Sequence, residues 1–161
     1  MKRLITALEL QLSMLEELYS LLKQETGELS DIHLAAMADI TMRKENVSSR
    51  IESHTKALLA EIEQAVSREG LPPKTSLGEL AARFSTKGNR VLSDLHAQLN
   101  NIASQVKQLL ALNREIAERF AASIGSSLEL LSRVINQSNV YGASGGYQQR
   151  PTGSVIINRE A

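Results

Sequence analysis

Apolar residues recur at alternating steps of three and four along most of the chain, the pattern of a helix that buries one stripe against a partner. In the first half this stripe begins at Leu8, keeps its phase past Gly27 and continues to about Ala65. Because two separate helices would have no reason to stay in phase, we predict one long helix over residues 2–69, bent at most near Gly27. A second helix capped by Ser30 or Asp31 is the alternative.

The stretch REGLPPK predicts the end of this first arm. Gly70 can adopt the left-handed cap conformation, and the two prolines that follow cannot continue a helix. Ser76 and Glu79 then stand at capping-box spacing, which predicts a short helix over residues 76–84. A second arm is expected over residues 89–136, where the alternation of three and four is regular from Leu92 to Phe120.

These elements predict an all-α fold. An isolated helix is marginal in water, so each stripe must be buried against another helix. The expected architecture is a long antiparallel helical hairpin, similar to a coiled coil, or a slim three-helix bundle if the first arm is broken. Residues 1–136 form the helical domain, and residues 137–161, rich in Gly, Ser, Asn and Gln, are expected to form a flexible C-terminal tail.

Composition narrows the classes of function. The chain of 161 residues is 42% hydrophobic and carries 18 basic and 18 acidic residues, so no net field attracts it to nucleic acid. It has no cysteine, and His33 and His54 would lie about 31 Å apart on a continuous helix, too far to share a metal. The opening MKRL is followed by too short an apolar run for a signal or a membrane span. We therefore predict a cytoplasmic protein that is not an enzyme and has no cofactor, metal or small-molecule substrate.

The end of the second arm carries more apolar surface than one stripe needs. A hairpin can shelter one side of this segment, and large exposed apolar patches usually mark binding surfaces. The hypothesis is a groove for an amphipathic helix of a partner. Its residues are Ile116, Phe120, Ile124, Leu128, Leu131, Val134 and Ile135, with Ala117, Ala121 and Leu130 beside them.

In two alternative arrangements this apolar segment would be covered and would not be available to a partner protein. The N-terminal part of the first arm could fold over the same segment with a second stripe, or the chain could dimerise there. The residues of that second stripe are Leu10, Met14, Leu18 and Leu21. The competing function is accordingly a self-associating coiled-coil spacer or adaptor protein without a client. Asn113 interrupts the apolar seam of the second arm, where a polar residue either fixes register or oligomeric state or is simply tolerated.

Three segments carry a resemblance to a known family. They are MLEELYSLLKQETGEL at residues 14–29, LALNREI around Asn113, and VYGASGG with Tyr141 and Gly142. With them the chain resembles the FlgN-type flagellar export chaperones over nearly its whole length. That family often has a second asparagine three residues before the first, where this chain has Leu110.

The resemblance implies a function and partners. Such proteins are cytoplasmic chaperones of flagellar type III export, which bind the C-terminal helices of the hook-associated proteins at the hook–filament junction. They prevent premature assembly of these clients and deliver them to the export gate. By this resemblance the apolar end of the second arm binds the client, and Tyr141 with Gly142 docks on the cytoplasmic domain of the gate. A weak homodimer is compatible with the same surface.

Overall fold

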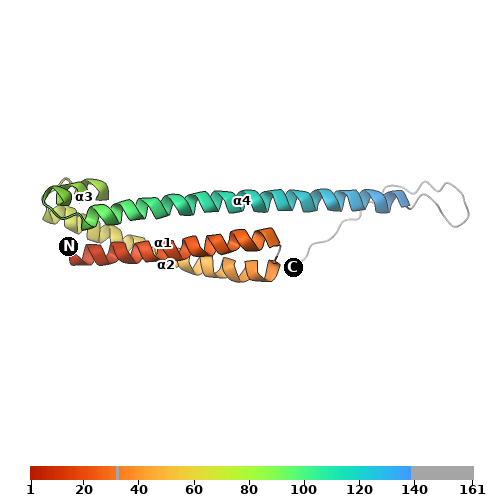
Figure 1. Cartoon of the computed structure of the whole chain (residues 1–161), viewed down its shortest axis with the longest axis horizontal. Helices are drawn as coiled ribbons and strands as arrows, with labels where there is room; N and C mark the ends of the chain where they lie inside the picture. The colour runs from red at the N-terminus through yellow and green to blue at the C-terminus, as the bar shows by residue number, and fades with distance from the viewer. Residues whose placement is uncertain (32, 139–161) are drawn as a thin grey trace, which may run out of the picture. The chain divides into compact units, whose positions relative to one another are not determined.

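The computed structural model describes residues 1–31 and 33–138 (Figure 1). Within these residues the regular structure consists of helices α1 (Lys2–Asp31), α2 (Leu34–Arg68), α3 (Leu77–Thr86) and α4 (Val91–Ser138). The all-α prediction is confirmed. The chain divides into two compact units, Met1–Ala117 and a second that begins at Glu118, and the two are described separately below.

The preferred single helix over residues 2–69 is wrong. Helix α1 ends at Asp31, α2 begins at Leu34, and the two helices pack side by side (Figure 1). The alternative, a second helix within the first arm, is correct. Its predicted cap by Ser30 or Asp31 is absent, because His33 occupies the N-cap position and makes no capping side-chain bond. Gly27 lies inside α1. The stripe keeps its phase because both helices bury it, with Leu22 in α1 and Val47 in α2 almost fully enclosed.

Helices α1 and α2 are antiparallel, as three pairs of side chains along their length demonstrate. Arg50 forms an ion pair with Glu17 at 3.0 Å, and His54 Nδ1 lies 2.9 Å from Gln11 Oε1. A third pair joins Lys44 to Glu25. Because the residue number rises in one helix as it falls in the other, the chain reverses its direction between the end of α1 and the start of α2.

The core of the first unit gathers side chains from all four helices. Leu4 and Leu8 of α1 meet Leu92 and Leu95 at the start of α4, and Leu80 of α3 lies in the same cluster. The buried members of this cluster are Leu4, Leu8, Leu58, Ala65, Val66, Leu80, Ala81, Leu92 and Leu95. Because Thr26, near the end of α1, contacts Asn113 far along α4, these two helices run parallel.

The predicted left-handed cap at Gly70 and the predicted capping box of Ser76 and Glu79 are confirmed. Gly70 and Gly88 both adopt positive φ, at 63° and 85°, where a residue with a Cβ is disfavoured. Ser76 caps α3, its hydroxyl accepting from the Glu79 backbone N–H while the Glu79 carboxylate accepts from the Ser76 N–H. The hydrogen bonds from the Ser76 backbone and side chain lower the pKa of Glu79. The capping box thereby fixes the start of α3, whose Leu80 and Ala81 belong to the core cluster.

A buried polar layer crosses the first unit at Asn113, which is only 5% exposed. Its amide nitrogen donates to the Leu22 carbonyl and to Glu25 Oε2, both at 2.9 Å. The Thr26 hydroxyl lies 2.6 Å from Asn113 Oδ1 and 2.9 Å from the Leu22 carbonyl, and its single proton can serve one of them at a time. Glu25 extends the layer to Lys44 of α2.

The layer favours the register-fixing interpretation of Asn113. Leucine-rich stripes alone would tolerate a slide of α1 along α4 by one heptad, since leucine would still meet leucine. Such a slide would separate Asn113 from Thr26 and Glu25 and leave an amide and a carboxylate among apolar side chains. Because unsatisfied buried polar groups are costly, the layer selects one register of the parallel pair.

We expect Asn113→Ala to lower the free energy of unfolding by about 1–3 kcal/mol, because it removes three hydrogen-bonded contacts from a buried site. Urea denaturation followed by circular dichroism measures this loss. Asn101→Ala, an exposed change on the same helix, should stay within about 0.5 kcal/mol of the unaltered chain. A double-mutant cycle with Thr26→Val should give a coupling of about 0.5–3 kcal/mol, and a coupling of zero would contradict the layer.

Candidate functional site

One side of helix α4 is apolar along its length except at Asn113. Val106, Asn113, Ala117, Ile124 and Leu131 follow each other at steps of seven, four, seven and seven, which 3.6 residues per turn places on one side. Up to Asn113 this side is buried, with Val106 only 7% exposed. The continuation of the same side beyond Ala117 is the candidate site.

Beyond Ala117 the side chains on this side are exposed. Ile124, Leu128 and Leu131 are 45%, 61% and 56% exposed, whereas Phe120 is half-buried. We call Phe120, Ile124, Leu128, Leu131 and Ile135 the distal apolar face. Five of the seven predicted client-binding residues thus share one side of the helix. The other two, Ile116 and Val134, flank it by helical periodicity.

The heptad frame of α4 changes where the face begins. From Leu92 to Phe120 the seam alternates by three and four, but the next steps, to Ile124 and Leu128, are both four. A second regular frame runs through Ala117, Ala121, Ile124, Leu128, Leu131 and Ile135. This four-residue stutter falls beside the division between the units at residues 117 and 118, and stutters locally unwind a supercoil. The distal apolar face therefore has a frame of its own, suited to a partner other than α1.

The polar side chains of Ser126, Ser127, Glu129 and Arg133 are all bonded within the helix. Ser126 and Ser127 donate their hydroxyl protons to the carbonyls of Ala122 and Ser123, at 3.1 and 2.9 Å. Arg133 pairs with Glu129 one turn away, and periodicity places both on the side opposite Ile124. What the face offers is apolar contact at helical spacing, which suits an amphipathic helix rather than a polar ligand.

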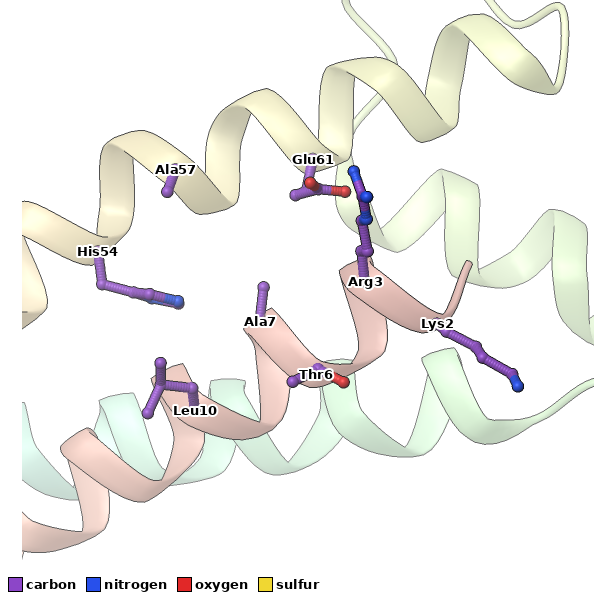
Figure 2. A pocket seen from close by; sticks show the side chains of 8 residues that line it. All are labelled: Lys2, Arg3, Thr6, Ala7, Leu10, His54, Ala57 and Glu61. Atoms are coloured by element: carbon purple, nitrogen blue, oxygen red, sulfur yellow. The ribbon is translucent and has the colours of Figure 1, made fainter.

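A hollow between α1 and α2 is one of the concave features of the first unit. Its volume is about 470 Å³, and Figure 2 shows Leu10, Ala7 and Ala57 along it. Arg3 and Glu61 point toward one another at one end, whereas Lys2 points away (Figure 2). In residues 1–31 and 33–138 no group of three or more His, Asp or Glu could hold a metal ion.

Sequence reasoning missed the partners of Asn113. Thr26 and Lys44 both stand on the predicted stripe of the first arm, where polar residues are unexpected. Polar residues at these seam positions signal a buried polar layer, but their spacing does not show that the first arm folds back to bring Thr26 to Asn113 and Lys44 to Glu25. Met14 and Leu21 of the proposed second stripe are buried within the first unit, and Leu10 is largely exposed. Tyr141 and Gly142 lie outside the described residues.

The described residues form an all-α protein with a leucine-rich core in its first unit and an exposed apolar side at the C-terminal end of α4. The family model described as FlgN protein matches residues 1–149. The chain belongs to the FlgN family, which consists of flagellar export chaperones that bind flagellar substrate proteins. Comparisons with curated proteins and with solved structures return no match. Among the described residues, no helix is both long and apolar enough to cross a membrane.

Proposed function

We propose that this chain is a cytoplasmic export chaperone for the hook-associated proteins of the flagellum. It binds their C-terminal amphipathic helices through the distal apolar face, with Ile116 and Val134 at its margins. Binding covers the client segments that would otherwise assemble prematurely, and the chaperone delivers its client to the cytoplasmic domain of the export gate. No catalytic step is assigned to it.

One observation carries this proposal: a single side of α4 is buried up to Asn113 and exposed from Ala121 to Ile135. In the first unit, α1 covers that side with leucines spaced by three and four. A client helix with the same spacing could cover the distal apolar face in the same way. The segment from Ala121 to Ile135 spans about 21 Å, enough for about four turns of a client helix.

The expected affinity suits a carrier that must release its client. Four to five large apolar side chains, each contributing about 1.5–3 kcal/mol when fully buried, give a gross gain of about 6–15 kcal/mol. Immobilising the two partners and ordering the client helix offsets a large part of this gain. We therefore expect a dissociation constant of about 1 μM, which corresponds to a binding free energy of about −8 kcal/mol.

Calorimetric titration tests the proposal directly. The full chain is titrated with a synthetic peptide that carries the C-terminal helical segment of a hook-associated protein. We expect saturable binding with a negative heat-capacity change, because apolar surface leaves water. Binding that persists unchanged after the distal apolar face is made polar would place the client site elsewhere, and absence of binding to every hook-associated segment would refute the function.

A separate prediction concerns gate docking. We expect Tyr141→Ala to leave helicity and client-peptide affinity unchanged while weakening binding to the cytoplasmic domain of the export gate at least about tenfold, the loss expected of an aromatic anchor. Surface plasmon resonance with immobilised gate domain measures it. Tyr147→Ala is the matched control, six residues further along the same segment. A fall in helicity with Tyr141→Ala would show that the tyrosine is structural instead.

A further inference from the structure

We infer that a client covers the distal part of α4 with two helices rather than one. The inference rests on the proposed function, because both helices belong to the client that the distal apolar face is proposed to bind. One helix lies on the distal apolar face, and the other lies on a second stripe beside it. We call this second stripe the lateral stripe, and its residues are Ser123, Ser127, Leu130 and Val134.

The lateral stripe has the spacing of a seam that faces a helix. Its residues follow each other at steps of four, three and four. Each of them directly precedes a residue of the distal apolar face, so the two stripes lie about 100° apart around α4. Leu130 and Val134 are 63% and 55% exposed. The Ser127 hydroxyl already donates to the Ser123 carbonyl, so a second helix that covers it leaves its proton satisfied.

A pair of neighbouring leucines in the first unit shows what two stripes require. Leu21 and Leu22 of α1 are both almost fully buried. Neighbouring residues on a helix point about 100° apart, so burial of both requires partners on two sides, and α1 packs against α2 and contacts α4. Leu130 and Leu131 form the same kind of pair, and residues 134–135 repeat it one turn later, but all four side chains are more than half exposed. The end of α4 therefore presents two sides that a partner can cover.

Other exposed leucines of α4 do not form a second stripe. Leu110 is 47% exposed, but Lys107 and Arg114 stand three residues before it and four after it, so charge interrupts its side of the helix. An isolated exposed leucine is common in proteins and indicates no partner. The residues in the corresponding positions beside Leu130 both belong to the lateral stripe, which contains no charge.

Charged residues mark the boundary of the surface. Residues 118–135 include four charged side chains, and at about 100° per residue these share an arc of about 100°. They are Glu118, Arg119, Glu129 and Arg133. Large apolar side chains, from Leu130 at one edge to Leu128 at the other, span about 160° of the remaining circumference. A helix that packs on one partner needs an apolar stripe about 100° wide, so one client helix would leave an edge of this surface in water.

The contact area also favours two client helices. A single helix on the distal apolar face would follow α4 for about 21 Å, and such a contact buries less than about 1,200 Å², the low end for specific complexes. A second helix on the lateral stripe adds a contact of similar length. Two helices that also pack on each other bury their own apolar sides. The client segment that fits is therefore an antiparallel helical hairpin with apolar residues at steps of three and four in each helix.

Leu130→Glu tests the second contact, because its side chain is exposed and the change removes no intramolecular core. The two probes are the full-length hook-associated protein and the peptide that carries its C-terminal helix alone. We expect the full-length protein to bind Leu130→Glu at least about tenfold more weakly than the unaltered chain, because the second helix would bury a carboxylate. The peptide should bind both chains within about twofold.

Ala122→Glu is the matched control for the affinity measurements. Ala122 is exposed on the same helix, and periodicity places it on the side of Glu118 and Glu129, away from both stripes. The change adds the same charge as Leu130→Glu and should leave the binding of both probes unaltered. If Ala122→Glu weakens the full-length protein as much as Leu130→Glu does, added charge rather than the lateral stripe explains the loss, and the inference is wrong.

The absence of cysteine from the chain allows the client segments to be located. Leu128→Cys on the distal apolar face and Leu130→Cys on the lateral stripe are each labelled with benzophenone maleimide and irradiated with the full-length client. Mass spectrometry identifies the client residues attached to each position. We expect two client segments separated by a turn, one from each position, because the two positions lie about 160° apart around α4.

The outcomes separate this inference from the proposed function. Attachment of one client segment to both positions, or to Leu128→Cys alone, would overturn the second helix and leave the chaperone function standing. Attachment of Leu130→Cys to a second copy of the chain, or to its own residues 139–161, while client is bound would assign the lateral stripe to that occupant and also overturn the inference. If neither the peptide nor the full-length protein binds the unaltered chain, the proposed function itself is refuted.

Discussion

Replacing Leu128 and Leu131 together by Glu is expected to weaken binding of the hook-associated helix by more than about 100-fold. Both side chains are more than half exposed, so the change removes no intramolecular core. Each would otherwise contribute about 1.5–3 kcal/mol on burial, and a combined loss of about 3–6 kcal/mol corresponds to that factor or more. Because Glu forms helix almost as well as Leu, α4 should remain intact. Calorimetric titration of the variant with the client peptide measures the effect.

The matched controls are Leu59→Glu and Met42→Glu on α2. These side chains are 53% and 63% exposed, so they resemble Leu131 and Leu128 in exposure but lie in the first unit. Both controls should bind client peptide as the unaltered chain does. If they weaken binding as much as the pair of changes on α4, general surface hydrophobicity rather than the distal apolar face holds the client.

Leu8→Ala should lower the free energy of unfolding of the first unit by about 2–5 kcal/mol, the range found when a buried leucine is truncated. Leu8 is fully buried in the cluster that joins all four helices, so the cavity would face every element of the unit. Urea denaturation followed at 222 nm measures the loss. A single shared transition is expected, because no helix of this unit has a separate core.

Leu10→Ala provides the control for this prediction. Leu10 lies on the same helix but is 47% exposed, beside the hollow in Figure 2, and its truncation should cost less than about 1 kcal/mol. Equal losses from the two changes would mean that α1 does not present Leu8 to the core. The fold-back of α1 on α2 and its parallel pairing with α4 would then both be wrong.

Local chemistry allowed much of the fold to be predicted. The capping box of Ser76 and Glu79 and the left-handed conformation of Gly70 depend on residues within a few positions of each other. The helix predicted over residues 89–136 extends over Val91–Ser138 for the same reason, since its stripe is continuous. The exposed apolar side of α4 was predicted from a surplus of large apolar residues, which requires only counting along the chain.

The break after Asp31 could not be read from periodicity. A stripe that passes through a turn without losing phase looks the same whether the helix continues or folds back, because both helices can face one core. The polar layer shows why the chain folds back: Thr26 and Glu25 of α1 and Lys44 of α2 satisfy one another and Asn113. These partners are brought together only by long-range packing, and propensity or spacing along the sequence does not encode them.

The sequence by itself determined that this protein is helical, where its second arm begins and ends, and that this arm carries excess apolar surface. Those properties follow from side-chain type and the helical period, which act locally. Only the tertiary structure decided that the first arm is two helices and that α1 runs parallel to α4 up to the Asn113 layer. The physical reason is that burial and hydrogen-bond satisfaction are shared among distant residues. These shared contacts bury one side of α4 up to Asn113 and leave Ile124, Leu128, Leu131 and Ile135 exposed.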